Sequence, residues 1–268
     1  MTSEELPTSS ALPDSSTPAR SRLRWWREVL YIAVFYSVYT LIRNHGIASG
    51  SGALAFRNAR QVIRAQGYLG IAHEETIQDL FLGWKPFIAF WDVFYGTAHF
   101  VVTVGALVYL FRRMPERYPL WRNTLALTTA LALLGFALYP LMPPRLLPES
   151  YGFVDTLRVV GGLWSFESGA VAKVSNPYAA MPSLHMAWSG WCVFVLVPAF
   201  RRPWAKQAMM GYPLLTLFAV VVTANHYFLD AVGGAVVLAS GFGLARIFTR
   251  WTHAGSAVED RPEALSVP

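Results

Sequence analysis

Six apolar runs, separated by polar or basic segments, dominate the pattern of the chain. They cover approximately residues 28–42, 86–111, 120–141, 183–200, 207–225 and 231–248. Runs of this length with few charges are typical of helices that cross a lipid bilayer. The pattern therefore predicts an all-α fold: a polytopic membrane protein with about six transmembrane helices, which form one membrane domain over residues 21–251.

The segment between Asn44 and Lys85 has a different, amphipathic pattern. Arg57, Arg60 and Arg64 recur at helical spacing opposite apolar positions, which predicts one or two helices lying in the membrane interface. Glu74 follows in a His-Glu-Glu triplet that lacks the second histidine of a zinc-protease helix. We therefore expect Glu74 on a solvated helix face.

The composition supports a membrane protein and limits its partners. Hydrophobic residues make up 54% of the chain, charged residues 14%, and the mean hydropathy is +0.36, which is more apolar than an ordinary soluble domain. The formal net charge is +6, but the basic residues lie beside apolar runs, as suits anionic lipid headgroups. The single cysteine, Cys192, permits no intrachain disulfide. We expect membrane lipids as partners and no nucleic acid.

The ends of the chain and its basic loops predict an orientation. Residues 1–20 are rich in Ser, Thr and Pro, which indicates a disordered N-terminal tail without a cleavable signal peptide, and residues 252–268 form a polar C-terminal tail. Basic residues gather at 112–122, 201–206 and 246–250. The positive-inside rule then places both termini in the cytoplasm and the opposite loops outside the cell. We therefore expect the protein in the plasma membrane. The arginines between residues 44 and 85 weaken this rule unless they lie along an interfacial helix.

A first histidine stands where an apolar run begins. Pro177 and Pro182 disfavour helix, and Ser183 is then a good N-cap that places His185 in the first helical turn. Free amides and the positive end of the helix dipole make such a turn suitable for phosphate. His185 could pass a proton to a departing oxygen there; a helix cap followed by a buried histidine is the alternative interpretation.

A second histidine stands at the corresponding end of another run. His226 and Asp230 are four residues apart, so on a helix they would share a face and could form a hydrogen bond. A carboxylate on one imidazole nitrogen leaves the other nitrogen as a nucleophile or base. Two such histidine sites at equivalent ends of apolar runs indicate a catalytic centre on the outer side.

A polar stripe runs through the second apolar run. Asp92, Tyr95 and His99 recur at helical spacing, so they should face the interior of the helical bundle. They could line a substrate cavity, or they could form a satisfied internal hydrogen-bond network.

With Pro-Pro-Arg145, Asn176-Pro-Tyr-Ala-Ala-Met-Pro-Ser-Leu-His185 and His226-x-x-x-Asp230 in this order, the chain resembles the type 2 phosphatidic acid phosphatase (PAP2) superfamily. The residues within these motifs are most similar to those of the inositolphosphotransferase branch, which is related to fungal inositol phosphorylceramide synthase. The resemblance implies a lipid phosphate substrate, His226 as the nucleophile that becomes phosphohistidine, Asp230 as its orienting group, and His185 as the acid and base. It also implies that no metal or cofactor is needed, and that water or an alcohol such as inositol accepts the phosphoryl group.

Two of the three cations of the family pattern are missing. No lysine stands at the matching distance before Arg145, and Ala219-Val220 occupies the place of the usual Ser-Arg. A phosphoryl group still needs charge stabilisation. We therefore expect further groups to assist Arg145 and Ser183 in binding phosphate or substrate: Arg158, Lys173, Asn225, His99 and Tyr95.

Three further interpretations compete with a lipid phosphatase or phosphotransferase. A transporter or lipid-binding bundle would show inverted repeats or broken helices, and no convincing internal repeat is present. An intramembrane serine protease would use Ser183, but its position after Pro182 is typical of a helix cap. The third is a metal site formed by His185, His226 and Asp230.

Overall fold

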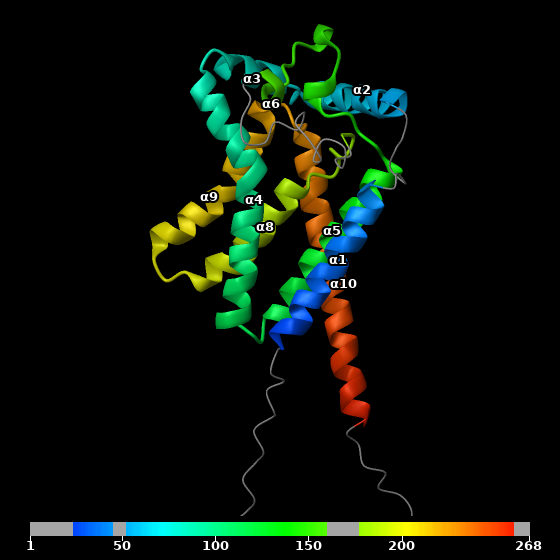
Figure 1. The fold of residues 1–268 in the computed structure, drawn as a ribbon, viewed down its shortest axis with the longest axis vertical. Coiled ribbons are helices and arrows are strands. Elements are labelled where there is room, and N and C mark those ends of the chain that lie inside the picture. Colours follow the sequence, from blue (N-terminus) through cyan, green and yellow to red (C-terminus); the bar gives the residue numbers. More distant parts are fainter. Residues whose placement is uncertain (1–23, 45–51, 160–176, 260–268) are drawn as a thin grey trace, which may run out of the picture.

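The computed structural model describes residues 24–44, 52–159 and 177–259, and every regular element within these ranges is helical (Figure 1). An isolated bridge between Leu141 and Ala179 is the one extended pairing among them. The helices are α1 (Trp25–Asn44), α2 (Gly52–Leu69), α3 (Glu74–Leu82), α4 (Lys85–Arg113), α5 (Tyr118–Leu138), η1 (Pro144–Leu146), η2 (Glu149–Tyr151), α6 (Thr156–Val159), α8 (Leu184–Leu196), η3 (Val197–Ala199), α9 (Pro203–Val222) and α10 (Phe228–Glu259).

A helix occurs at each of the six apolar runs, which confirms the all-helical prediction for the described residues. By length and composition, α4, α9 and the Phe228–Trp251 part of α10 could cross a membrane. The apolar helix Leu184–Ala199 is shorter, and α1 and α5 do not meet the same criteria. Three candidate spans are thus shown, and the other three stay a prediction. α10 continues to Glu259, which lies within the segment predicted to be a polar tail.

Two helices, α2 and α3, cover one end of the bundle (Figure 1), where the sequence predicted one or two amphipathic helices. We call this pair the cap. One face of α2 is buried and includes Ala55, Ala59 and Val62, whereas Arg57 and Arg60 on the other face are exposed. This division is what the helical spacing of the arginines predicts.

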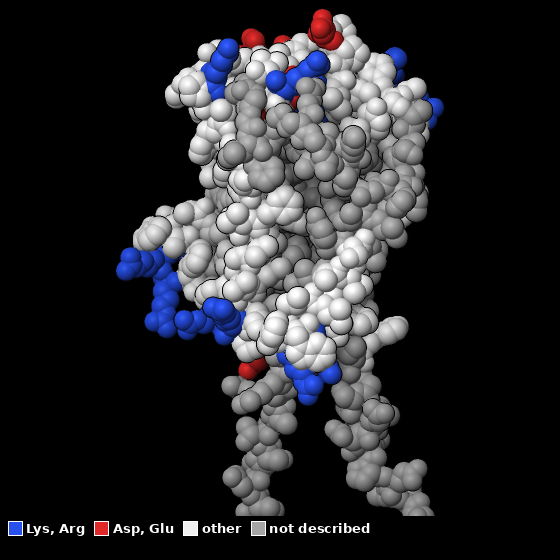
Figure 2. All heavy atoms as spheres, viewed as in Figure 1, with Lys and Arg blue, Asp and Glu red and all other residues white. Residues whose placement is uncertain are grey.

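Charged side chains are distributed unevenly between the two ends of the bundle. Figure 2 shows Lys and Arg at both ends of the bundle, whereas acidic side chains on this face lie mainly at the cap end. At the end opposite the cap, exposed basic residues lie at the end of α4 (Arg112 and Arg113) and just before α9 (Arg201 and Arg202). These positions match two of the basic segments noted in the sequence.

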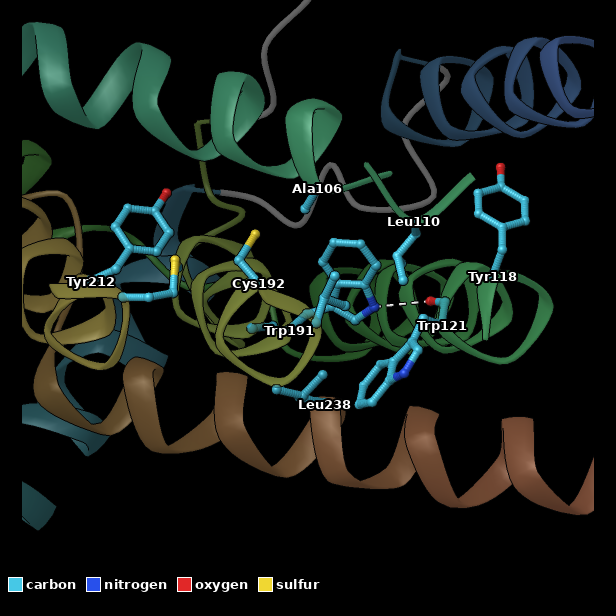
Figure 3. Close-up of a cluster of buried hydrophobic side chains, with 11 residues drawn as sticks. Ala106, Leu110, Tyr118, Trp121, Trp191, Cys192, Tyr212 and Leu238 are labelled. Atoms are coloured by element: carbon cyan, nitrogen blue, oxygen red, sulfur yellow. Dashed lines mark hydrogen bonds between the residues drawn. The ribbon is translucent and has the colours of Figure 1, made fainter. Parts of the chain in front are cut away.

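The central core is built around Trp191 of α8 (Figure 3). Its ring is fully buried, and its Nε1 donates a hydrogen bond of 2.9 Å to the carbonyl oxygen of Trp121 on α5. Leu110 of α4, Tyr212 of α9 and Leu238 of α10 belong to the same cluster. One aromatic side chain therefore joins the helices that position the site, and its only polar atom is satisfied, as burial requires.

Glycines let α10 approach its neighbours closely. A Cβ added at Gly234 would lie 2.5 Å from the carbonyl oxygen of Ser183, and one added at Gly241 would overlap the Thr128 side chain of α5. Small residues permit such backbone contact between helices in membrane proteins. The start of α8 is therefore seated directly on α10.

Candidate active site

The turn after α9 brings the second histidine to the cap end of the bundle. Ala224 adopts a left-handed conformation with φ of 52°, and its amide donates to the carbonyl of Val221. The Asn225 amide donates to the carbonyl of Val220 at 2.9 Å. These two bonds form a Schellman motif, in which glycine normally occupies the left-handed position. Alanine there costs about 1–2 kcal/mol, a strain of the kind that is concentrated at functional sites.

His226 lies in this turn and not on a helix, which corrects the predicted geometry. The expected hydrogen bond nevertheless exists: His226 Nδ1 lies 3.3 Å from Asp230 Oδ2. The same oxygen accepts the amide of Tyr227 at 2.9 Å. Because α10 begins at Phe228, Asp230 occupies the position from which a side chain reaches back to the capping residue. The same carboxylate oxygen therefore satisfies an amide at the N-terminus of α10 and orients the imidazole of His226.

The tyrosine that follows His226 secures the turn from its other side. Tyr227 is fully buried, and its hydroxyl donates to the carbonyl of Met142 at 3.1 Å. Burial raises the pKa of Tyr227 above its ordinary value, so the hydroxyl keeps its proton. This bond links the His226 turn to the loop that carries Arg145.

His185 lies in the first turn of α8, as predicted. Ser183 is the N-cap, and its hydroxyl accepts a hydrogen bond from the Met186 amide at 3.4 Å. Its own amide donates to the carbonyl of Asp230 at 3.0 Å. The amides of Leu184 and His185 donate to no other described residue. They remain suited to an anion, whereas the hydroxyl of Ser183 already serves as a cap.

The two histidines face each other. His226 Nε2 lies 3.3 Å from His185 Nδ1. When His226 donates its Nδ1 proton to Asp230, its Nε2 carries a lone pair and accepts the Nδ1 proton of His185. The chain Asp230–His226–His185 therefore presents a nucleophilic nitrogen beside a second imidazole that can carry a proton.

Two rings from α4 support His185. Tyr95 stacks on His185 with ring centroids 4.4 Å apart, and His99 meets it edge-on at 4.2 Å. His99 is itself oriented by its Nδ1, which lies 3.0 Å from the Tyr95 carbonyl. The same residues border a narrow gap against Thr216 and Val220 of α9. Tyr95 and His99 thus contact the predicted acid and base, and a role of the polar stripe in lining a substrate cavity stays a prediction.

Arg145 is held next to His226 by several contacts. Its amide donates to the carbonyl of Ala224 at 2.8 Å. Its Nε donates to Asn225 Oδ1 at 3.0 Å, and its Nη1 forms an ion pair with Asp155 at 3.0 Å. The Asn225 amide group donates in turn to Thr223. Asn225 therefore orients Arg145 in the structure, a contact that the sequence did not indicate.

Asp92 borders the same group of residues. It is buried, and its Oδ1 accepts a hydrogen bond of 2.7 Å from Thr156, the neighbour of Asp155. The sequence placed Asp92 in the bundle interior but gave no sign that it meets Thr156, because 64 positions separate the two residues.

Two of the predicted phosphate-binding residues are not brought to the centre by the described contacts. Arg158 lies on the short helix α6 with an exposed side chain, and Lys173 lies outside the described residues. Among the described residues, no group of three or more His, Cys, Asp or Glu side chains is arranged to hold a metal ion. The assembled groups can still perform acid–base and nucleophilic chemistry on an anion.

Glu74 contradicts the sequence prediction of a solvated helix face. It is only 3% exposed, and its Oε1 accepts the amide of Phe228 at 2.9 Å and the side-chain amide of Gln66 at 2.7 Å. The residues next to Glu74 in the sequence are solvated, so they gave no sign that its side chain is buried. The pattern of polar and apolar residues on the short helix α3 cannot show that the start of α10 packs against it.

Comparison with known proteins bears on this assembly. No curated protein and no solved structure matches the chain. A model of the PAP2 superfamily, however, matches residues 60–244. That range includes Arg145, both histidines and Asp230, and three helices long and apolar enough to cross a membrane lie wholly or largely within it. Because the match covers more than half of the chain and every residue of the centre described above, this membrane protein belongs to the PAP2 superfamily.

Proposed function

We propose that this protein is a membrane-bound phosphatase or phosphotransferase that cleaves a lipid-linked phosphate through a phosphohistidine on His226. Membership of the PAP2 superfamily indicates phosphatase or phosphotransferase activity. The observation that carries the proposal for this chain is the contact of His226 with both Asp230 and His185 beside Arg145.

The first half-reaction follows from this arrangement. Nε2 of His226 attacks phosphorus, and the bond from phosphorus to the leaving alcohol breaks while His185 supplies the proton that the alcohol needs. Arg145 and the open amides at the start of α8 stabilise charge on the phosphoryl oxygens. An in-line transfer places phosphorus between the nucleophile and the leaving oxygen. The 3.3 Å contact between the two imidazoles must therefore open when substrate binds.

The second half-reaction restores the enzyme. His185, now neutral, removes a proton from the incoming water or alcohol, which attacks the phosphohistidine and releases His226. The similarity of Asn176–His185 to the inositolphosphotransferase branch supports inositol as the alcohol. The covalent intermediate is the same for both acceptors, so the identity of the acceptor has to be measured.

The test is a turnover assay on the purified protein in lipid nanodiscs. Short-chain phosphatidic acid and other lipid phosphates are supplied with and without inositol, and free phosphate is followed against transferred phosphate. We expect turnover, an acid-labile phosphoenzyme with radiolabelled substrate, and the loss of both in His226→Ala. Asp230→Asn should be less severe, because the nucleophile remains. A phosphoenzyme that persists in His226→Ala would refute the assignment.

We also propose six transmembrane helices, with both termini in the cytoplasm and the centre on the outer face of the plasma membrane. The exposed residues Arg112, Arg113, Arg201 and Arg202 at the end opposite the cap support this orientation. On a Cys192→Ser background, a cysteine that replaces Glu149 should react with an impermeant reagent added to intact cells, and one that replaces Glu116 should not. The reverse pattern would overturn the orientation.

A contrasting interpretation is a transporter or lipid-binding bundle without catalysis. The hydrogen-bonded chain Asp230–His226–His185 favours the enzyme, because a binding site has no need of a nucleophile oriented by a carboxylate. Binding of a lipid phosphate without release of phosphate, transfer of phosphate or phosphoenzyme would favour the alternative.

A further inference from the structure

The buried face of the cap contacts the first turn of α10. Glu74 of α3 accepts the amide of Phe228 at 2.9 Å, and Gln66 of α2 accepts the amide of Leu229 at 2.9 Å. The two side chains are also joined by the Gln66 Nε2 hydrogen bond to Glu74 Oε1, at 2.7 Å. Gln66 is fully buried and Glu74 nearly so. We call this pair the cap clamp.

The clamp completes the hydrogen bonding at the start of α10. The first amides of a helix have no partner within the helix. Here the Tyr227 amide bonds to Asp230, and the next two amides bond to the clamp. The carboxylate of Glu74 also lies at the positive end of the helix dipole, which favours a negative charge there. The segment that carries His226 and Asp230 is thus held from inside by Asp230 and from outside by the cap.

Two other buried polar side chains of the cap also bond to backbone groups near the site. The side-chain amide of Gln78 exchanges two hydrogen bonds of 2.9 Å with the backbone of Val154, one residue before Asp155. Asn58 donates to the carbonyl of Pro140 at 2.8 Å. The buried polar side chains of α2 and α3 therefore bond the backbone of segments that carry the site.

We propose that Glu74 and Gln66 are positioning residues for the reaction at His226, an inference that rests on the proposed function. They contact neither the histidines nor the substrate-binding groups. Instead, they fix the backbone one and two residues beyond Tyr227, and so set the placement of His226 against His185. A buried carboxylate is costly unless it is well bonded, and Glu74 meets this requirement through the amides it accepts.

Two substitutions separate the reach of the Glu74 side chain from its charge. Glu74→Gln loses the charge but keeps an oxygen that can accept both N–H groups. Glu74→Asp keeps the charge but withdraws the oxygen by one methylene. If reach matters, Glu74→Gln should keep kcat within about threefold of wild type and Glu74→Asp should lower it at least about tenfold, since small misplacements of reacting groups reduce rate steeply. Asp79→Ala, which removes an exposed carboxylate from the same helix, is the matched control.

The readouts are chosen to separate a positioning defect from general damage. Assays with p-nitrophenyl phosphate in nanodiscs should show the loss in kcat for Glu74→Asp, with KM and the inhibition constant of inorganic phosphate changed by less than about threefold. The phosphate-binding groups are untouched, so ground-state binding should persist. Equal loss in Glu74→Gln and Glu74→Asp, or a loss that falls entirely on KM, would overturn the positioning role.

Hydrogen–deuterium exchange gives a measurement that does not depend on activity. Peptides that begin before Asn225 and cover Phe228 should exchange at least about tenfold faster at this amide in Glu74→Asp than in wild type, because the Phe228 amide loses its acceptor. Peptides from α5 should be unchanged, and Asp79→Ala should match wild type throughout. If wild-type protein hydrolyses no phosphate ester, the proposed function fails, and the exchange result alone decides the clamp. Unchanged exchange at the start of α10 would refute the clamp even in an active enzyme.

Discussion

The closest backbone approach near the site gives a sharp prediction for Gly234→Ala. Gly234 lies one turn after Asp230 on α10, and an added Cβ would stand 2.5 Å from the carbonyl oxygen of Ser183 and 3.0 Å from Cβ of Met186. Ordinary contact begins at 3.4 Å, so the start of α8 would have to retreat by about 0.9 Å. Backbone atoms cannot evade this contact by changing rotamer.

The retreat acts directly on the two histidines, because His185 sits on α8 and His226 is anchored to α10. Overpacking of this kind typically costs about 1–3 kcal/mol of stability. A misplacement near 1 Å can reduce the rate of catalysis about 10²-fold. We therefore expect Gly234→Ala to remain folded and to lose turnover by about 10²-fold.

The matched control is Gly243→Ala, on the same helix. A Cβ there meets nothing within 4 Å. At an exposed helix position, alanine stabilises the helix by up to about 1 kcal/mol relative to glycine. Both variants are assayed for release of phosphate in nanodiscs and for thermal unfolding by tryptophan fluorescence. Turnover of Gly234→Ala equal to that of Gly243→Ala would refute the argument that α8 and α10 set the distance between the histidines.

Two further substitutions test the roles assigned within the centre. His185→Ala should reduce turnover of a lipid phosphate by about 10²–10⁴-fold, as loss of a general acid does. Turnover of p-nitrophenyl phosphate should fall less, because its leaving group needs no proton. Equal losses for the two substrates would exclude the acid role. Arg145→Ala should lower kcat/KM strongly, and Arg145→Lys should restore only part of the loss. The reason is that a lysine cannot bond both Asn225 and Asp155 as the guanidinium does. A kcat/KM of Arg145→Lys equal to that of wild type would show that charge alone suffices.

Much of this architecture is determined by local sequence. Apolar runs of helical length and an amphipathic segment predicted the long helices and one or two amphipathic helices between the first two of them, because helix formation depends on residues close in the chain. Ser183 after Pro182 likewise predicted the start of α8 and the position of His185. The spacing of His226 and Asp230 predicted their hydrogen bond.

Other features were decided by tertiary structure alone. The hydrogen bond between His226 and Asp230 joins the turn before α10 to the first turn of that helix, and does not run along one helical face. The reason is that the left-handed Ala224 ends α9 and the next helix begins only at Phe228. Glu74 seemed to be solvated, yet it is buried because the start of α10 packs against it over 154 positions of sequence. Spacing within a segment reports which residues share a face. What that face meets depends on how distant helices pack, and in this protein that packing determines which side chains hold the histidines in place.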